Sequence, residues 1–273
     1  WSNVPEDDWV LQDDMSWVIG EFVWTGFDYL GEPTPYDSYW PSRSSYFGIC
    51  DLAGLPKDRY YLYRSRWNTA DKTIHLLPHW TWKDRQGEVT PVYCYTNYPT
   101  AELFVNGKSQ GRITKDVNSK YDRYRLKWNN VTYQPGELKV VVYDQAGQKM
   151  GEESIHTAGK AAKLELSSDR KSISADGEDM AFITVKIKDK DGNLCPDADN
   201  ELQFHVSGAG VYQAACNGDA TSIESFTGAQ MKAFHGELVM IVRSAKQAGD
   251  IRISIKDLKN KHLNNEIIVK SIK

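Results

Sequence analysis

The chain has 273 residues, of which 40% are hydrophobic and 26% charged, so it can bury a core and is not composed like a disordered chain. Its formal net charge of -4 excludes the broad basic surface of a general nucleic-acid binder. Because no apolar run approaches the roughly 20 residues that a membrane-spanning helix needs, we expect a soluble protein. Its length predicts two or three domains.

The first 70 residues differ from the rest in aromatic content and in charge. They hold sixteen of the thirty-two aromatic residues and eleven acidic against five basic side chains, whereas residues 160–273 hold five aromatics and no tryptophan. A second change falls at the small, flexible stretch 157–162, which has no periodicity of its own. The predicted domains are therefore 1–70, 71–159 and 160–273.

Three elements are predicted in the first region, in the order helix, strand, helix. Two Trp-Val pairs, at residues 9–10 and 17–18, lie behind an acidic start at near-helical spacing and predict a helix within residues 6–18. The apolar run 21–24 predicts a buried strand, and a long loop rich in glycine and proline follows it. Aromatic residues at helical spacing after a proline predict a second helix over residues 56–67.

From residue 74 onward the chain shows short runs of period-two alternation, which is typical of strands. Residues 101–105 lead into Asn106-Gly107, a strong hairpin signal because both residues tolerate positive φ. Residues 138–143 and 181–188 alternate similarly and end at turns. Since a seven-strand sandwich takes about 100 residues, we predict a mainly β fold of two successive immunoglobulin-like sandwiches.

Two short motifs suggest chemistry and are better explained as turns. Residues 107–111 match Gly-x-Ser-x-Gly, but that motif works at a strained strand-to-helix turn, and here it follows a hairpin signal. Residues 189–193 resemble the start of a calcium loop, yet Leu194 and Asn200 stand where the loop needs glycine and glutamate. We expect a hairpin turn at both places.

Cysteine and histidine usage predicts no cofactor and no catalytic metal. The four cysteines form no Cys-x-x-Cys pair and are expected to be free, and the six histidines show no metal-ligand spacing. The chain opens on Trp1 without a signal-like segment, so we expect it to be a piece of a longer protein.

The most informative stretch runs from residue 21 to residue 58. Trp24 ends the predicted strand, and the loop behind it carries carboxylates, an arginine and several aromatic rings. Such a mixture suits a sugar, whose apolar faces stack on rings while its hydroxyls bond to charged groups. An aromatic loop that only caps a domain explains the same residues equally well.

The sequences WTGFDYLGEPTPY (24–36) and WPSRSSYFGICDLAGLPKD (40–58) resemble the eighth strand and following loop of the catalytic (β/α)8 barrel in glycoside hydrolase family 2, the β-galactosidase type. The segments AELFVNGKSQG (101–111) and SADGEDMAFITVKIKDKDGNLCPDADN (174–200) resemble the immunoglobulin-like domains that follow the barrel. Residues 1–70 are then a remnant (strand, loop, helix) of that barrel.

The resemblance implies a retaining mechanism with two glutamates on barrel strands upstream of this chain, so the chain by itself is predicted to be inactive. It implies that Trp24 forms a wall of the sugar subsite, with Asp28 and Glu32 at the catalytic mouth. Neither Glu21 nor Glu32 is proposed as a catalytic group. Tyr29, Trp40 and Arg43 suit holding the loop in shape equally well.

Two alternatives remain open: a carbohydrate-binding or adhesive module, and domains that only brace the barrel. The middle region offers six aromatic residues as candidate sugar contacts, whereas the last region resembles a spacer: Trp80, Trp82, Tyr95, Tyr98, Tyr121 and Trp128. A single strand cannot complete a barrel, so we expect residues 21–24 to pack on the first sandwich or on another chain. The resemblance further implies a carbohydrate partner (a β-galactoside) and a periplasmic or cell-surface location, and a homo-oligomer is left open. The net charge and the lack of a long apolar run predict no nucleic-acid partner and no membrane span.

Overall fold

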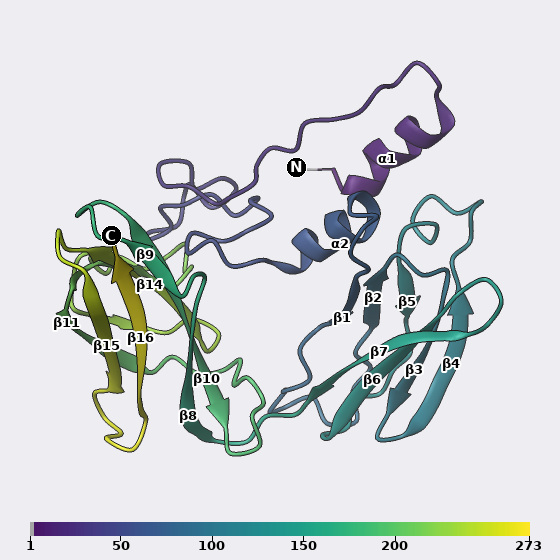
Figure 1. Ribbon diagram of the computed structural model, residues 1–273. Coiled ribbons are helices and arrows are strands. Elements are labelled where there is room, and N and C mark those ends of the chain that lie inside the picture. Colours follow the sequence, from purple (N-terminus) through teal and green to yellow (C-terminus); the bar gives the residue numbers. More distant parts are fainter. Residues whose placement is uncertain (1–2) are drawn as a thin grey trace. The chain divides into compact units, whose positions relative to one another are not determined.

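The computed structural model describes residues 3–273, which are mainly strand and form two compact units (Figure 1). The first unit comprises the described residues up to Gly26 with 47–50 and 56–157, and the second comprises 27–46, 51–55 and 158–273. Each unit contains one β-sandwich, which confirms the predicted fold class. The domain boundaries near residues 70 and 160 stay predictions.

Two helices belong to the first unit. They are α1 (Pro5–Asp14) and α2 (Asp58–Trp67). The second confirms the helix predicted over residues 56–67, whereas the first ends at Asp14 rather than at residue 18. Negative charge is unfavourable in the last turn of a helix, and Asp13 and Asp14 there are held by the guanidinium groups of Arg66 and Arg123.

The first sandwich has seven strands in two antiparallel sheets, as expected. One sheet has the order β1-β2-β5 and the other the order β4-β3-β6-β7. The strands are β1 (Ile74–Leu77), β2 (Val92–Thr96), β3 (Thr100–Val105), β4 (Lys108–Thr114), β5 (Leu126–Trp128), β6 (Glu137–Tyr143) and β7 (Lys149–His156). Asn106 and Gly107, both at positive φ, form the predicted hairpin between β3 and β4.

The second sandwich has nine strands rather than the seven that its length predicted. Its sheets have the orders β12-β14-β10-β8 and β13-β11-β15-β16-β9. The strands are β8 (Ala161–Ser168), β9 (Ser172–Ser174), β10 (Met180–Asp189), β11 (Glu201–Gly208), β12 (Gly210–Cys216), β13 (Gln230–Lys232), β14 (Glu237–Ser244), β15 (Gly249–Asp257) and β16 (Asn264–Ile272). The two extra strands are three-residue pieces at sheet edges, β9 and β13, too short for an alternating pattern to reveal.

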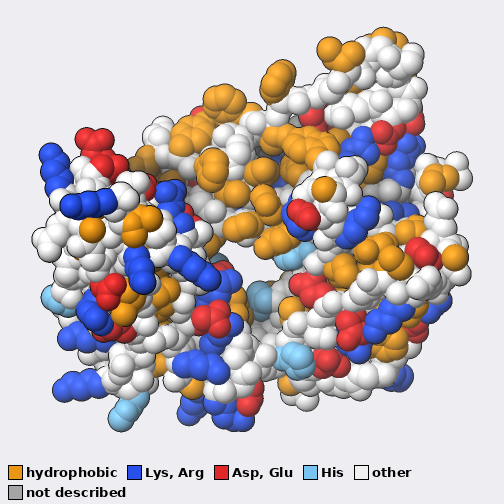
Figure 2. All heavy atoms as spheres, in the orientation of Figure 1, with side chains coloured by type: hydrophobic (Ala, Val, Ile, Leu, Met, Phe, Trp, Pro, Cys, Tyr) orange, Lys and Arg blue, Asp and Glu red, His pale blue; other side chains and the backbone are white. Residues whose placement is uncertain are grey.

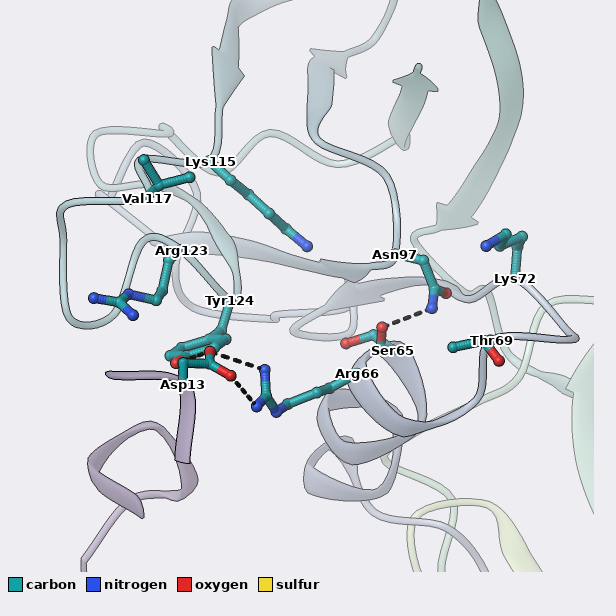
Figure 3. A pocket seen from close by; sticks show the side chains of 10 residues that line it. All are labelled: Asp13, Ser65, Arg66, Thr69, Lys72, Asn97, Lys115, Val117, Arg123 and Tyr124. Carbon is teal, nitrogen blue, oxygen red and sulfur yellow. Dashed lines mark hydrogen bonds and ion pairs between the residues drawn. The ribbon is translucent and has the colours of Figure 1, made fainter. Parts of the chain in front are cut away.

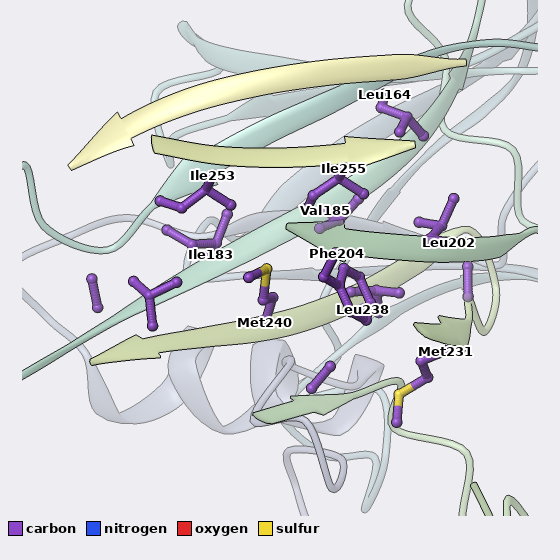
Figure 4. Packing of buried hydrophobic residues seen from close by; sticks show 14 of the residues in the cluster. Leu164, Ile183, Val185, Leu202, Phe204, Met231, Leu238, Met240, Ile253 and Ile255 are labelled. Atoms are coloured by element: carbon purple, nitrogen blue, oxygen red, sulfur yellow. The ribbon is translucent and has the colours of Figure 1, made fainter. Parts of the chain in front are cut away.

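Both sandwiches bury alternate residues of their strands, because successive side chains point to opposite faces of a sheet. In the second, Ile183 and Val185 of β10 pack with Phe204, Leu238 and residues of β15 in a core free of tryptophan (Figure 4). In the first, the core is more aromatic and includes Trp80 and Tyr133.

A third apolar cluster joins the helices to the first sandwich. Trp9 of α1 is fully buried, and its ring meets Tyr63 of α2 and Tyr124 edge-on, with 5.2 Å between ring centroids in each pair. Tyr95 of β2 completes the contact. The N-terminal helix is therefore fixed to the sandwich by one large anchor, since a buried aromatic pair contributes about 0.5–1.5 kcal/mol beyond its buried area.

The predicted buried strand at residues 21–24 is absent from the described structure. No strand pairs with these residues, and the side chains of Phe22 and Trp24 are 104% and 75% exposed. An isolated strand is not stable, because its backbone groups need a partner. Packing on the first sandwich is confirmed only for Val23, which is partly buried against the cluster that contains Tyr95. Figure 2 shows hydrophobic side chains standing out along the segment that follows α1, where Trp17 and Ile19 are also exposed.

Within residues 3–273, no helix has both the length and the apolar character needed to cross a bilayer.

Candidate functional site

Trp24 lies on an irregular segment of the first unit and presents its ring to solvent. The backbone on its C-terminal side is held firmly, because the amide of Ile49 donates to the carbonyl of Thr25 (3.0 Å) and that of Cys50 to the carbonyl of Gly26 (2.9 Å). The peptide bond between Trp24 and Thr25 is cis. An exposed indole on a fixed backbone can serve as a stacking platform for an apolar ring face.

Asp28 and Glu32 belong to the second unit, on a loop that is paired with a later stretch of itself. Residues 29–31 run antiparallel to residues 43–45, through a bridge between Leu30 and Ser44 and a hydrogen bond from the Gly31 amide to the Arg43 carbonyl (3.0 Å). The loop is thus built as a short two-stranded turn, which gives its side chains defined positions.

The two carboxylates of this loop have different surroundings. Asp28 is buried and accepts a hydrogen bond from the hydroxyl of Ser45 (3.4 Å). Glu32 is exposed and accepts a hydrogen bond from the hydroxyl of Tyr29. Glu32 can therefore reach a ligand from solvent, whereas Asp28 faces the loop that it stabilises.

Arg43 and Tyr29 hold the loop in shape, one of the two roles left open for them. The guanidinium of Arg43 lies 5.3 Å from the ring centroid of Phe226, and its backbone amide donates to the carbonyl of Ala220 (3.2 Å). Trp40, by contrast, is mostly exposed.

Glu21 is engaged within the first unit. Its carboxylate accepts a hydrogen bond from the indole of Trp9 (2.8 Å). Burial raises the pKa of Glu21, and the Trp9 hydrogen bond opposes that rise only in part. This contact ties Glu21 to the packing of α1.

The aromatic residues of the first sandwich considered as sugar contacts are largely core residues. Trp80 is 1% exposed and donates its indole N–H to the carbonyl of Gln134 (2.9 Å), and the buried Trp128 donates to the carbonyl of Gly111 (2.9 Å). Trp82 is half-buried beneath Arg85 and beside His79. Tyr95 is also buried and Tyr98 is half-buried, whereas Tyr121 is exposed. One exposed ring of the six does not form the platform of several rings that a sugar-binding module needs.

The two short motifs form turns, as expected. Ser109 follows the hairpin turn and donates its hydroxyl to Glu102 (2.7 Å), a neighbouring strand residue. Asp189 accepts hydrogen bonds from Gly159, Asp191 and Asn193. Burial alone would raise the pKa of Asp189, but these hydrogen bonds outweigh it and lower the pKa far below its ordinary value. None of the four cysteines, all of which the structure describes, forms a disulfide, as predicted.

The first unit also contains a cavity of about 500 Å³ that sequence reasoning did not identify (Figure 3). We call it the cationic cavity, because four cations and one carboxylate line it: Arg66, Lys72, Lys115, Arg123 and Asp13. These residues come from α1, from α2 and the turn after it, and from the β4–β5 connection, so no single stretch of sequence carries a signal for the site.

Comparison with known proteins agrees with this architecture. Residues 164–264 match the model of glycoside hydrolase family 2 C-terminal domain 5, and residues 87–151 match a domain of unknown function, DUF4982. A β-galactosidase of Bacteroides ovatus is 44% identical over 255 residues, which are 93% of this chain and 29% of that protein. A putative β-glucuronidase of Formosa agariphila is 31% identical over 96% of this chain and 25% of its own length.

Solved structures give the same result. A β-glycosidase from Bacteroides vulgatus superposes with a TM-score of 0.87 at 32% identity, over 97% of this chain and 32% of that one. A glycosyl hydrolase family 2 member from Bacteroides cellulosilyticus superposes with a TM-score of 0.86 at 30% identity, over 98% of this chain and 38% of that one.

The two sandwiches and the segment before them have the fold of the corresponding part of these glycoside hydrolases. The chain belongs to glycoside hydrolase family 2, in which it corresponds to a C-terminal portion. It spans about a quarter to a third of the length of the curated relatives named above.

Proposed function

We propose that this chain is the C-terminal accessory portion of a retaining glycoside hydrolase that cleaves β-galactosides, here called the parent enzyme. The observation that carries the proposal is the 44% sequence identity with the Bacteroides ovatus β-galactosidase over 93% of this chain. A retaining mechanism needs two carboxyl groups about 5–5.5 Å apart. In this proposal both are glutamates of the part of the parent enzyme that precedes this chain, so the chain performs no hydrolysis.

Within the parent enzyme, Trp24 forms one wall of the sugar subsite. The exposure of its ring and the hydrogen bonds that fix residues 25 and 26 support this role. Glu32 is a weaker candidate for contacts with sugar hydroxyls because it is exposed but engaged by Tyr29. Asp28 is weaker again, since it is buried against Ser45.

A β-glucuronide is the second candidate substrate. The Formosa agariphila relative, named a putative β-glucuronidase, matches 96% of this chain, although at lower identity than the β-galactosidase. Side-by-side rates of the parent enzyme on nitrophenyl β-galactoside and nitrophenyl β-glucuronide decide between them, and we expect the galactoside to be turned over faster.

The two sandwiches act as bracing domains in this proposal. Burial of Trp80 and Trp128 argues against a carbohydrate-binding module built on the first sandwich. A periplasmic or cell-surface location and assembly into a homo-oligomer are part of the proposal by family resemblance alone.

The test compares the purified chain with the parent enzyme on nitrophenyl β-galactoside. We expect turnover by the parent enzyme and none by the chain. Turnover by the chain, or by its Glu21→Gln/Glu32→Gln double variant, would contradict the proposal, and the comparison of the two would show whether those carboxylates cause it.

A further inference from the structure

The cationic cavity has no part in the proposed hydrolysis and lies wholly in the first unit. Its two arginines are each engaged by a carboxylate. Arg66 forms a two-point contact with Asp13 (2.7 and 3.2 Å), and Arg123 forms one with Asp14 (2.9 and 3.3 Å). Because these pairs neutralise one another, the arginines and aspartates form a fixed wall.

The two lysines of the cavity have no such partner. Among residues 3–273, neither Lys72 nor Lys115 makes an ion pair with a carboxylate. Lys72 is exposed at the cavity, whereas Lys115 is half-buried. The cavity therefore keeps two positive charges that nothing in the described chain neutralises.

Lys115 is the more informative of the two. Its side chain points into the space between Tyr124 and Asn97, and its ammonium group donates to the carbonyl of Thr96 (2.5 Å), which leaves donors for a ligand (Figure 3). Burial lowers its pKa to about 8, against a weak opposing effect of Cys94. Partial burial of a cation without a counter-ion is unfavourable, and an anion bound in the cavity would offset that effect.

Apart from Val117, the rest of the lining carries polar groups, and one of its residues is held firmly. Asn97 is locked in place, because its amide donates to the carbonyls of Ser65 (2.7 Å) and Asn68 (3.1 Å) and its oxygen accepts from the Thr73 amide (2.6 Å). About 500 Å³ is far more than an inorganic ion needs and lies within the ordinary range of small-molecule sites.

We propose that the cationic cavity binds an anionic sugar, a saccharide that carries a carboxylate or a sulfate group, with Lys115 contacting the anionic group and Lys72 adding positive charge to the lining. The choice of a saccharide rests on the proposed function, whereas the uncompensated positive charge does not depend on it. The cavity would then recognise acidic residues of the glycan at a place separate from Trp24.

The experiment is calorimetric titration of the purified chain at neutral pH with galacturonate, galactose 6-sulfate, galactose and sodium sulfate. We expect saturable binding of one or both acidic sugars and none of galactose, and the two acidic sugars separate a carboxylate from a sulfate site. Lys115→Met should weaken binding at least about tenfold because it removes a charge-assisted contact, and Lys72→Met about threefold because it removes one positive charge of the lining.

Lys108→Met, on the exposed part of β4, is the matched control and should bind like the unchanged chain. Equal affinity for galactose, equal affinity for sulfate alone, unchanged affinity in both lysine variants, or no binding of either acidic sugar would overturn the inference. If the Lys115→Met variant does not fold, the affinity of the Lys72→Met variant for the acidic sugars tests the inference instead, because Lys72 is exposed. Because no turnover is measured, failure here is distinct from failure of the proposed hydrolysis.

Discussion

Trp24 and Lys115 both differ in solvent exposure from what is usual for their residue types. Most of the Trp24 ring is in solvent, although burying a tryptophan is among the larger apolar gains that a fold can make. Lys115 is half-buried without a carboxylate partner, although lysines are mostly exposed. Side chains that go against the general tendency in this way are candidates for binding.

The half-buried amine of Lys115 should make the stability of the chain depend on pH. The pKa of Lys115 is lowered from 10.5 to about 8 in the folded chain. Below pH 8 the ammonium group is therefore charged in the folded state, where burial disfavours the charge. Between pH 8 and 10.5 the unfolded chain binds more protons, and stability should rise with pH. Lys115→Met, which carries no proton, should raise the free energy of unfolding by about 1–3 kcal/mol near neutral pH.

Urea denaturation of the two chains at about pH 7 and about pH 9.5 measures this difference, which should shrink as the pH rises. Lys108→Met serves again as the control for loss of a lysine. A Lys115→Met variant that is no more stable at neutral pH, with the same pH dependence as the unchanged chain, would show that the amine is not disfavoured in the fold.

At the scale of elements, local patterns succeeded where the element has its partners within the chain. The alternation over residues 101–105 and 181–188 corresponds to β3 and β10, both of which are paired on two sides. The run 21–24 has an equally apolar pattern, but no strand of the described structure pairs with it. Composition can identify a stretch that suits a strand, whereas strand formation also requires a neighbour.

The connection between β11 and β12 makes a prediction at this scale. Gly208, the last residue of β11, has a φ of +87°, and a Cβ added there would lie 2.1 Å from the backbone oxygen of Asp250. Gly208→Ala should therefore lower the free energy of unfolding by about 3 kcal/mol or more, because the strain of positive φ adds to a backbone clash.

Gly192 provides the matched comparison. It has a similar φ of +95°, but the nearest atom to an added Cβ is the flexible Lys163 Nζ at 3.8 Å. Gly192→Ala should lower the free energy of unfolding by about 1 kcal/mol, because only backbone strain opposes it. Thermal unfolding of the two variants measures the difference, and equal losses would mean that the backbone approach at Gly208 is not tight.

For the whole molecule, the sequence was informative about architecture and much less so about sites. Two sandwiches follow from periodicity, and the segment around Trp24 could be recognised because its residues are contiguous. The cationic cavity could not, because Asp13, Lys72, Lys115 and Arg123 are brought together only by the docking of α1 and α2 on the first sandwich. Prediction from one sequence therefore fails for a site assembled from separate elements.

We propose that this chain supplies a sugar-stacking wall and no catalytic group to a larger glycosidase. Its most direct test is the kcat/KM of the parent enzyme for nitrophenyl β-galactoside after Trp24→Ala and, as a control of equal exposure (75% each), after Trp17→Ala. We expect Trp24→Ala to lower kcat/KM about 10- to 100-fold, with an unchanged melting temperature, and Trp17→Ala to leave it nearly unchanged. A Trp24→Ala enzyme as active as the Trp17→Ala control would contradict the account.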